Sequence, residues 1–346
     1  MQDATTYNPT GLDGFAFLEF SGPDFKALDH QFMSMGFNRV AKHNNADVTL
    51  YRQGNIQFIV NNTPNSQAAN HAKTHGAGAC AMGFKVKDAQ MAYEYVIDKG
   101  AKPYLGSPLH GLLAIEAIGG SVIYFVDDNS APFNGDWDNQ QTKAASFDAG
   151  LVFIDHLTHN VQRGNMDKWA KFYSDLFNFS EIRYFDIKGK LTGLISRAMG
   201  SPCGKIKIPL NESKDDKSQI EEFLHDYNGE GIQHIALNTD NIYHSVSGLR
   251  QQQISFLTVP DTYYEMLGDR IPWHQEPLAK LQDLQILVDG ENTPEHGLLL
   301  QIFTENIFGP VFFEIIQRKG NDGFGEGNFQ ALFEAIERDQ IRRGTL

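Results

Sequence analysis

Three residues with metal-binding side chains stand in segments that otherwise read as buried strands: His156 in FIDHLTH, His234 in GIQHIAL and Glu314 in FFEII. Glu314 has apolar neighbours on both sides, and a buried carboxylate costs several kcal/mol unless it is paired or bound to a metal. Two imidazoles and one carboxylate, with open positions left on the ion, suit a non-haem Fe(II) site that activates O2. Zinc is the alternative, because hydrolases use the same set of donors.

The spacing of these residues favours a site inside a sheet. His156 and His234 are 78 residues apart, and His234 and Glu314 are 80 apart. The helical H-E-x-x-H motif of zinc hydrolases is absent from the sequence. Each residue also has a simpler interpretation, because a lone histidine in an apolar strand is more often part of the core than a ligand.

The elements that carry these residues occur twice along the chain. Each half contains a strand followed by an amphipathic helix, then a strand with a polar turn and a helix, and then a closing apolar strand. These units lie at 11–37, 78–100 and 121–128 in the first half, and at 150–179, 231–253 and 310–317 in the second.

The repeat predicts an α+β fold of two domains, residues 1–140 and 150–346, with a polar linker near 129–149. Each domain is expected to contain paired βαβββ-type modules that form a curved, mostly antiparallel open barrel with helices outside. The curvature is inferred by analogy with known folds of this kind, whereas the order of the elements comes from the sequence pattern.

Comparison of the two halves predicts a metal site in the second half alone. Each candidate ligand has an apolar counterpart at the matching position of the first half. The matched pairs are His234 with Ala81, Glu314 with Phe125, and His156 with Leu18. The same comparison favours His156 over His159, which strand alternation places on the opposite face together with Asp155.

Composition argues against several classes of function. The 346 residues carry a net charge of −14, which disfavours a polyanionic partner such as nucleic acid. No apolar run approaches the roughly 20 residues needed to span a bilayer, and the N-terminal segment lacks the features of a secretory signal. With only Cys80 and Cys203, no disulfide framework is expected, so we predict a cytoplasmic protein.

Seven segments carry a family resemblance. In order they are IDHLTHNV, RYFDIKGKLTGLISRAMGSPCGKIKIPLNE, GEGIQHIAL, PDTYYEML, LLLQIF, GPVFFEIIQRKG and GFGEGNFQALFEAIERDQIRRG. Together they resemble the 4-hydroxyphenylpyruvate dioxygenase family of the vicinal oxygen chelate superfamily. The resemblance covers almost the whole second half, and a weaker similarity extends into the first.

The resemblance implies a specific activity. Enzymes of this family hold one Fe(II) per subunit in the C-terminal domain, and the matching ligands here are His156, His234 and Glu314. The implied reaction converts 4-hydroxyphenylpyruvate and O2 to homogentisate and CO2, in tyrosine and phenylalanine degradation. The family also implies a homo-oligomer.

The resemblance further implies which residues contact the substrate. They are Ser196, Asn211, Gln219, Gln301, Phe303, Phe312, Phe324, Asn328 and Phe329. A phenylpyruvate requires an aromatic slot and a few amides or hydroxyls for its phenol, and these residue types supply both. Taken singly, each phenylalanine is more often a core residue. Residues 323–329, GFGEGNF, read as a hinge into a last helix that closes over the cavity and excludes water.

Two other functions stay open at this point. 4-Hydroxymandelate synthase shares the implied fold, metal and substrate but oxidises the side chain, and the GNF pattern before the last helix favours the dioxygenase. A non-catalytic binding protein of the same fold is the other alternative, against which the complete set of three ligands argues. Haemolysin-like or pigment-related names among bacterial relatives would reflect the oxidation of homogentisate to a dark polymer.

Overall fold

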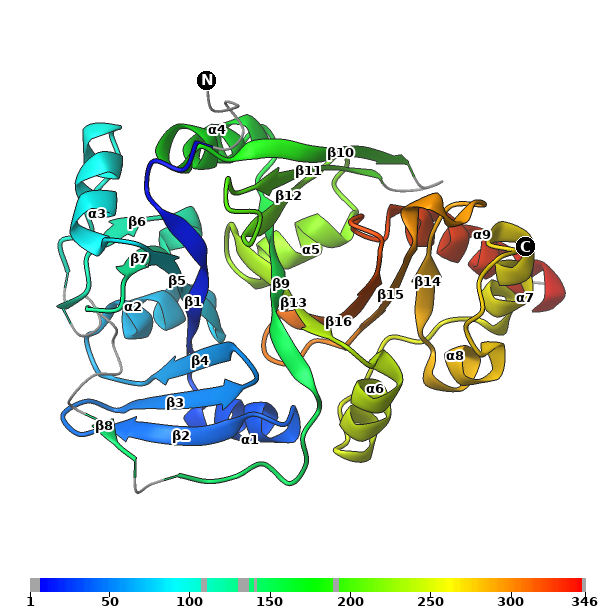
Figure 1. Ribbon diagram of the computed structural model, residues 1–346, viewed down its shortest axis with the longest axis horizontal. Coiled ribbons are helices and arrows are strands. Elements are labelled where there is room, and N and C mark those ends of the chain that lie inside the picture. The colour runs from blue at the N-terminus through cyan, green and yellow to red at the C-terminus, as the bar shows by residue number, and fades with distance from the viewer. Residues whose placement is uncertain (1–6, 107–110, 130–136, 140–141, 189–192, 344–346) are drawn as a thin grey trace.

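The computed structural model describes residues 7–106, 111–129, 137–139, 142–188 and 193–343. These residues form two mixed sheets, one from each half of the sequence, with helices packed around them (Figure 1). The α+β class and the mostly antiparallel pairing expected from the sequence are confirmed.

The first half of the chain supplies one eight-stranded sheet. In spatial order its strands are β6 (Ala114–Glu116), β7 (Val122–Val126), β5 (Gly78–Val86), β1 (Leu12–Ser21), β4 (Ile56–Asn61), β3 (Val48–Gln53), β2 (Asn38–His43) and β8 (Trp137–Asp138). At its centre β1 runs antiparallel to β5. The parallel pairs β1–β4 and β5–β7 flank this centre.

The second half repeats this plan. Its strands, in spatial order, are β10 (Ser180–Lys188), β11 (Gly193–Gly200), β12 (Lys207–Ser213), β9 (Leu151–Val161), β13 (Gly231–Thr239), β16 (Phe312–Lys319), β15 (Leu298–Phe303) and β14 (Leu287–Asp289). The antiparallel centre is β9–β13, flanked by the parallel pairs β9–β12 and β13–β16. The sheet curls from β10 at the top of Figure 1 to β14 at the right, which gives a half-barrel.

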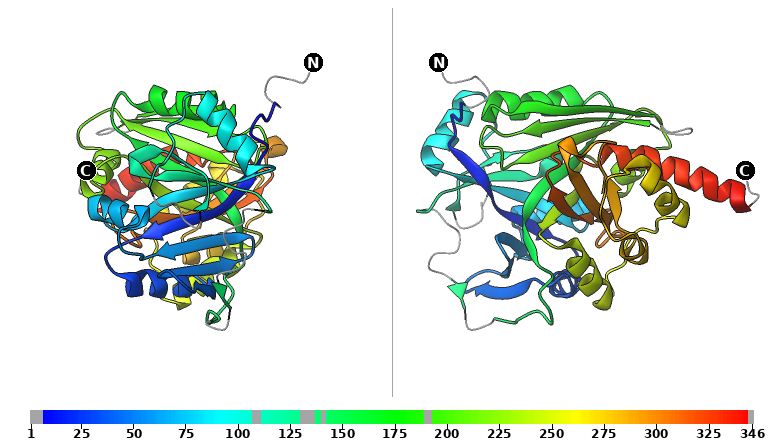
Figure 2. Two further views of the ribbon diagram at one scale, coloured as in Figure 1. Left: turned by 90° about the vertical axis from the view of Figure 1, so that its left-hand side faces the viewer. Right: turned by 45° about the vertical axis from the view of Figure 1, so that its right-hand side comes forward.

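Helices connect the strands in the order that the repeat predicts. They are α1 (Phe25–Ser34), α2 (Gln67–His75), α3 (Ala89–Asp98), α4 (Met166–Phe177), α5 (Gln219–Asp226), α6 (Ile242–Gln251), α7 (Asp261–Arg270), α8 (Leu278–Leu284) and α9 (Glu326–Arg343). The side chains of Asp24, Asp88 and Asn241 cap the N-termini of α1, α3 and α6, respectively, by accepting a hydrogen bond from a backbone N–H of the first turn. The last helix, α9, projects beyond the rest of the chain (Figure 2). Among the described helices, none has the length and apolar character of a membrane span.

The two sheets share one hydrophobic core. Their outer faces and the helices contribute to a single buried cluster that draws on both halves. Phe308 of the second half lies 5.6 Å from Phe20 of the first, measured between ring centroids, and Phe177 lies 5.4 Å from Phe84. Each predicted domain therefore contains one sheet, while a common core joins them. The boundary between residues 140 and 150 stays a prediction.

The inner faces of the two sheets differ. In the first half this face is filled by an apolar cluster that includes Phe17, Ala81 and Tyr124. Strand pairing matches these residues to the three candidate ligands of the second half. The pairs are Phe17 with His156, Ala81 with His234, and Tyr124 with Glu314.

Two of the counterparts expected from the sequence are wrong by one residue. Leu18 and Phe125 were matched to His156 and Glu314, but both belong to the shared core. A shift of one residue moves a side chain to the other face of a sheet. The central strands of both sheets contain register shifts that strict alternation does not reveal.

A buried carboxylate in the first half makes stability depend on pH. Glu19 on β1 is fully buried, and this burial raises its pKa to about 7, against hydrogen bonds from Asn61 and Tyr124. Because the folded protein holds this proton more tightly than the unfolded chain, the contribution of Glu19 to stability is fully present below pH 4.5 and is lost as the pH rises to about 7. We expect Glu19→Gln to remove this pH dependence. Between low pH and pH 8, the free energy of unfolding of the variant should therefore rise by roughly 3 kcal/mol relative to that of the wild type. Urea unfolding at pH 5 and pH 8 measures the difference, and an identical pH dependence in both proteins would contradict it.

Candidate metal centre

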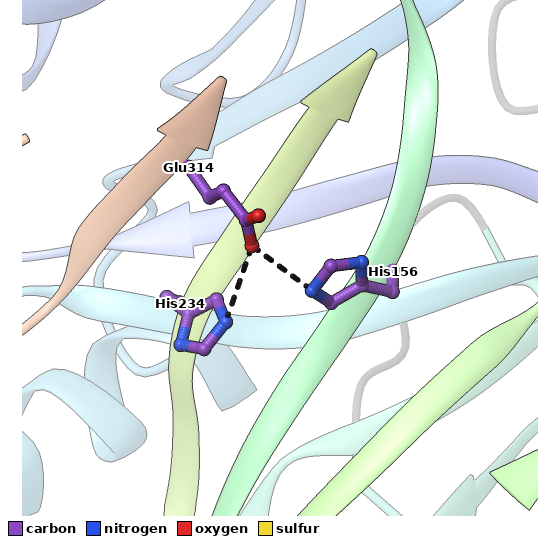
Figure 3. Close-up of side chains that lie close together, drawn as sticks. All are labelled: His156, His234 and Glu314. Carbon is purple, nitrogen blue, oxygen red and sulfur yellow. Dashed lines mark ion pairs between the residues drawn. The ribbon is translucent and has the colours of Figure 1, made fainter. Parts of the chain in front are cut away.

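Strand register brings the three predicted ligands together. His156 on β9 and Glu314 on β16 both pair with Ala236 on β13, the strand between them. His234 lies two residues earlier on β13, so the three side chains project from one face of adjacent strands. Figure 3 shows them converging, with Nε2 of His156 3.1 Å and Nε2 of His234 3.7 Å from Oε2 of Glu314. Their ligand atoms all lie within 4.8 Å of one another.

The surroundings of these atoms fit a bound cation. Glu314 is 2 % exposed, and its Oε1 has no hydrogen-bond partner among the described atoms. Burial, together with the charge of His156, holds the pKa of His234 well below its usual value and leaves that ring neutral. Burial also opposes the protonation of His156, but the carboxylates of Glu314 and Asp155 outweigh it and raise the pKa of this ring. A divalent cation among the three side chains would neutralise Glu314 and use both imidazole lone pairs.

Each ligand histidine is held by the residue that precedes it. Nδ1 of His156 lies 2.9 Å from Oδ1 of Asp155, and Nδ1 of His234 lies 3.2 Å from Oε1 of Gln233. Asp155 and Gln233 are each the extra residue of a β-bulge, because the pairing of β9 with β13 skips both. The expectation that Asp155 points away from His156 is therefore wrong. With Nδ1 of each ring occupied, the Nε2 atoms are directed at Glu314.

His159 belongs to the core. Its Nε2 lies 2.8 Å from the hydroxyl of Tyr173 on α4. Strand pairing gives it the position that Phe20 occupies in the first half. Burial lowers its pKa to about 3. The structure thus brings His156, the preferred candidate, to Glu314 and keeps His159 away.

A pocket opens beside the three ligands, and several predicted substrate residues line it. They are Ser196, Asn211, Phe303, Phe324 and Phe329. Ser196 on β11 and Asn211 on β12 are directly paired, so their side chains lie on the same face of the sheet. The pocket therefore combines aromatic walls with a hydroxyl and an amide.

Four predicted substrate residues are not among those that line the pocket. Phe312 stacks on His234 at the edge of the site, with ring centroids 4.8 Å apart. Gln301 on β15 and Asn328 in the first turn of α9 are buried. Gln219 is exposed where α5 begins. Direct substrate contacts by these four residues stay predictions.

Sequence reasoning missed several residues around the site. Gln233 and Arg318 contact His234 and Asp155, respectively. The pocket is also lined by Thr158, Phe185, Leu194, Pro209 and Glu326. One signal was available, because an acceptor directly before each ligand histidine is suited to orient its ring. Arg318 carried no such signal, since it lies far from Asp155 in the sequence.

Family models match both halves of the chain. Residues 6–136 match the family described as "Hydroxyphenylpyruvate dioxygenase, HPPD, N-terminal". Residues 153–270 match the "Glyoxalase/Bleomycin resistance protein/Dioxygenase superfamily". The first range spans the strands of the first sheet up to β7, and the second begins within β9 and ends before β14, β15 and β16.

Individual proteins are similar over their full length. The chain is 69 % identical to a 4-hydroxyphenylpyruvate dioxygenase of Legionella pneumophila (strain Corby), and 98 % of each chain is covered. It is 55 % identical to a protein of Vibrio vulnificus named Hemolysin VllY, again over 98 % of each. Among solved structures, a mutant of 4-hydroxymandelate synthase from Streptomyces coelicolor matches with a TM-score of 0.79 and 26 % identity, over 95 % of this chain and 99 % of that chain.

Proposed function

The chain belongs to the 4-hydroxyphenylpyruvate dioxygenase family, and from this premise we propose that it acts through one Fe(II) per subunit, held by His156, His234 and Glu314. It is a dioxygenase of tyrosine and phenylalanine catabolism that converts 4-hydroxyphenylpyruvate and O2 to homogentisate and CO2. The observation that supports the iron site is the convergence of both Nε2 atoms on Oε2 of Glu314, a buried carboxylate whose other oxygen, Oε1, has no hydrogen-bond partner among the described atoms. Two imidazoles and one carboxylate are the donors typical of a non-haem Fe(II) oxygenase.

The protein contributes binding and orientation to this reaction. When bound, Fe(II) supplies the O2 activation that the oxidation requires. Phe303, Phe324 and Phe329 form apolar walls that orient the aromatic ring of the substrate and exclude water. Ser196 and Asn211 offer the hydroxyl and the amide that a phenol can bind. Beyond the three ligands, we assign no residue as an acid or a base.

The first turn of α9 closes the pocket. Glu326 and Phe329, both in this turn, contribute to its lining. Asn328 accepts a hydrogen bond of 2.7 Å from the hydroxyl of Tyr263 on α7, and Arg270 reaches the same side-chain oxygen. Hydrogen bonds between α7 and α9 therefore hold the helix that shields the site from solvent.

The product distinguishes this activity from that of 4-hydroxymandelate synthase. Supplied with Fe(II), ascorbate and 4-hydroxyphenylpyruvate, the protein is expected to consume O2 and to release homogentisate and CO2. Chromatography against authentic standards identifies the product, because homogentisate and 4-hydroxymandelate have the same mass. Recovery of 4-hydroxymandelate would contradict the assignment. Oxygen uptake that does not depend on the substrate would point to the non-catalytic alternative.

Removal of one ligand tests the site itself. We expect His234→Ala to lose both stoichiometric iron and homogentisate formation, because the two remaining donors hold the ion poorly. His244→Ala is a matched control, since this histidine on α6 is exposed and its ring is hydrogen-bonded to the carbonyl of Asp148, away from the three ligands. Iron analysis and product chromatography on both variants give the readout. If His234→Ala kept both properties, the assignment of this ligand would be wrong.

Three further expectations rest on the sequence. A homo-oligomer is implied by the family. The net charge of −14 supports the absence of a nucleic-acid partner. Cytoplasmic localisation stays a prediction from cysteine content and from the sequence of the N-terminal segment.

A further inference from the structure

The carboxylate behind His156 is held by an arginine fork. Oδ1 of Asp155 accepts hydrogen bonds from Nδ1 of His156 and, at 2.7 Å, from Nη2 of Arg318. Oδ2 accepts from Nε of Arg318, also at 2.7 Å. The side chains of Asp155 and Arg318 are only 2 % and 13 % exposed. Because two parallel bonds fix the plane of the carboxylate, the orientation of the His156 ring depends on Arg318.

Arg318 also holds the segment that leads into α9. Its Nη1 donates to the carbonyl of Asn321 at 2.9 Å and to that of Gly323 at 2.7 Å. The next residue, Phe324, has its ring 5.9 Å from the guanidinium carbon and 5.2 Å from the ring of His156, measured to centroids. His156 is therefore connected to Phe324 in two ways. One is the direct contact of the two rings, and the other runs through Asp155, Arg318 and the backbone of residues 321–323.

The first half shows that the bulge does not require this carboxylate. The pairing of β1 with β5 skips Ala16 and Cys80, the residues equivalent to Asp155 and Gln233. The same backbone irregularity therefore forms with a methyl group in place of the carboxylate. We conclude that the carboxylate of Asp155 is not needed to form the bulge, and that its role is to bind His156 and Arg318.

We propose that Asp155 and Arg318 form a positioning pair that couples the orientation of the metal ligand His156 to the pocket wall at Phe324. This inference rests on the metal site proposed above. Substitution of a carboxylate that orients a ligand imidazole typically weakens metal binding by about 10–100-fold. Gln233 is neutral and lies 3.2 Å from His234, so it holds the second ligand less firmly.

The test compares metal affinity with the protection of the segment at 320–325. Metal-free full-length protein is titrated with Co(II) by calorimetry, and amide hydrogen exchange is followed with and without the metal. We expect Asp155→Asn to weaken Co(II) binding by about 10–100-fold, while exchange at 320–325 in the metal-free protein stays near the wild-type rate. Arg318→Met is expected to weaken binding by about 10-fold or more and to accelerate exchange, so that Co(II) no longer protects the segment. Arg318→Lys, which keeps the charge but lacks the fork, should fall between Arg318→Met and the wild type.

Arg39→Met is the matched control, because Arg39 binds Asp29 in the first half, with an Nη2–Oδ1 distance of 2.5 Å. It should leave both readouts within twofold of the wild type. The proposal is overturned if the Asp155 and Arg318 variants bind Co(II) as the wild type does, or if the control loses as much affinity. If Arg318→Met does not fold, Asp155→Asn and Arg318→Lys decide the outcome by the same readouts. His156→Ala distinguishes failure of the proposed metal site from failure of the proposed coupling. If this variant bound Co(II) as the wild type does, His156 would not be a ligand and the metal site itself would be refuted.

Discussion

Glu314→Gln is expected to lose metal binding, and with it homogentisate formation, while the chain remains folded. The substitution keeps the shape of the side chain but removes the only negative charge among the three ligands. Loss of one partner from a buried charged cluster costs roughly 4 kcal/mol, which corresponds to about a thousandfold weaker binding. Thermal unfolding with and without Fe(II) under anaerobic conditions measures this loss. At saturating metal the wild type should gain roughly 4 kcal/mol, and the variant almost none.

A second buried glutamate supplies the control for this experiment. Glu19 is fully buried on β1, at a position of the first sheet equivalent to Thr158 beside the site. Glu19→Gln should therefore retain wild-type metal binding and activity, although its stability responds differently to pH. Stoichiometric iron together with homogentisate formation in Glu314→Gln would rule out Glu314 as a ligand.

The ligands could be predicted from the sequence because few environments tolerate them. A glutamate within FFEII has no local partner, and burial without one is costly, so its presence indicates a cation. The repeat strengthened the argument by showing apolar residues at the corresponding places in the first half. His234 and its counterpart Ala81 were matched correctly, since both stand at the fourth residue of their strands, β13 and β5.

The bulges are what the sequence pattern could not reveal. Alternation assumes one residue per step, but the central strand pair of each sheet has three register shifts, and positions beyond such a shift change face. For this reason Asp155 was separated from His156. Leu18 was mismatched for another reason: both halves have the bulge at the same place, and only strand pairing shows that Phe17 is the counterpart of His156. Arg318 was unpredictable for a different reason. Its contact with Asp155 depends on how β16 and β9 are placed across the sheet, which no local pattern encodes.

The substrate residues show the same limit. Ser196 and Asn211 reach the pocket together because β11 and β12 pair them. Gln219, identified only by resemblance, is exposed where α5 begins. Residue type and family resemblance name the candidates, but the direction of a side chain follows from the packing of its element. The aromatic residues illustrate this, since Phe303 lines the pocket, while Phe312, whose ring lies 6.2 Å from that of Phe303, stacks on His234.

Phe58→Ala is expected to destabilise both halves of the protein at once. Phe58 is fully buried on β4, and its ring stacks on Phe37 with centroids 4.5 Å apart. It also lies 6.1 Å from Phe313 of the second half, which directly precedes Glu314. Truncation of a buried phenylalanine leaves a cavity that costs about 3–5 kcal/mol. Because the core is continuous, urea unfolding followed by hydrogen exchange should show peptides of both halves losing protection in a single, earlier transition.

Phe153→Ala distinguishes this loss from a general effect of removing a phenyl ring. Phe153 lies on β9 but is 43 % exposed, so its truncation should change the free energy of unfolding by no more than about 0.5 kcal/mol. If Phe58→Ala unfolded the first half alone, with the second half retaining its wild-type midpoint, the two sheets would be independent units. The aromatic contacts between them would then contribute little to holding β16, and the metal ligand it carries, in place.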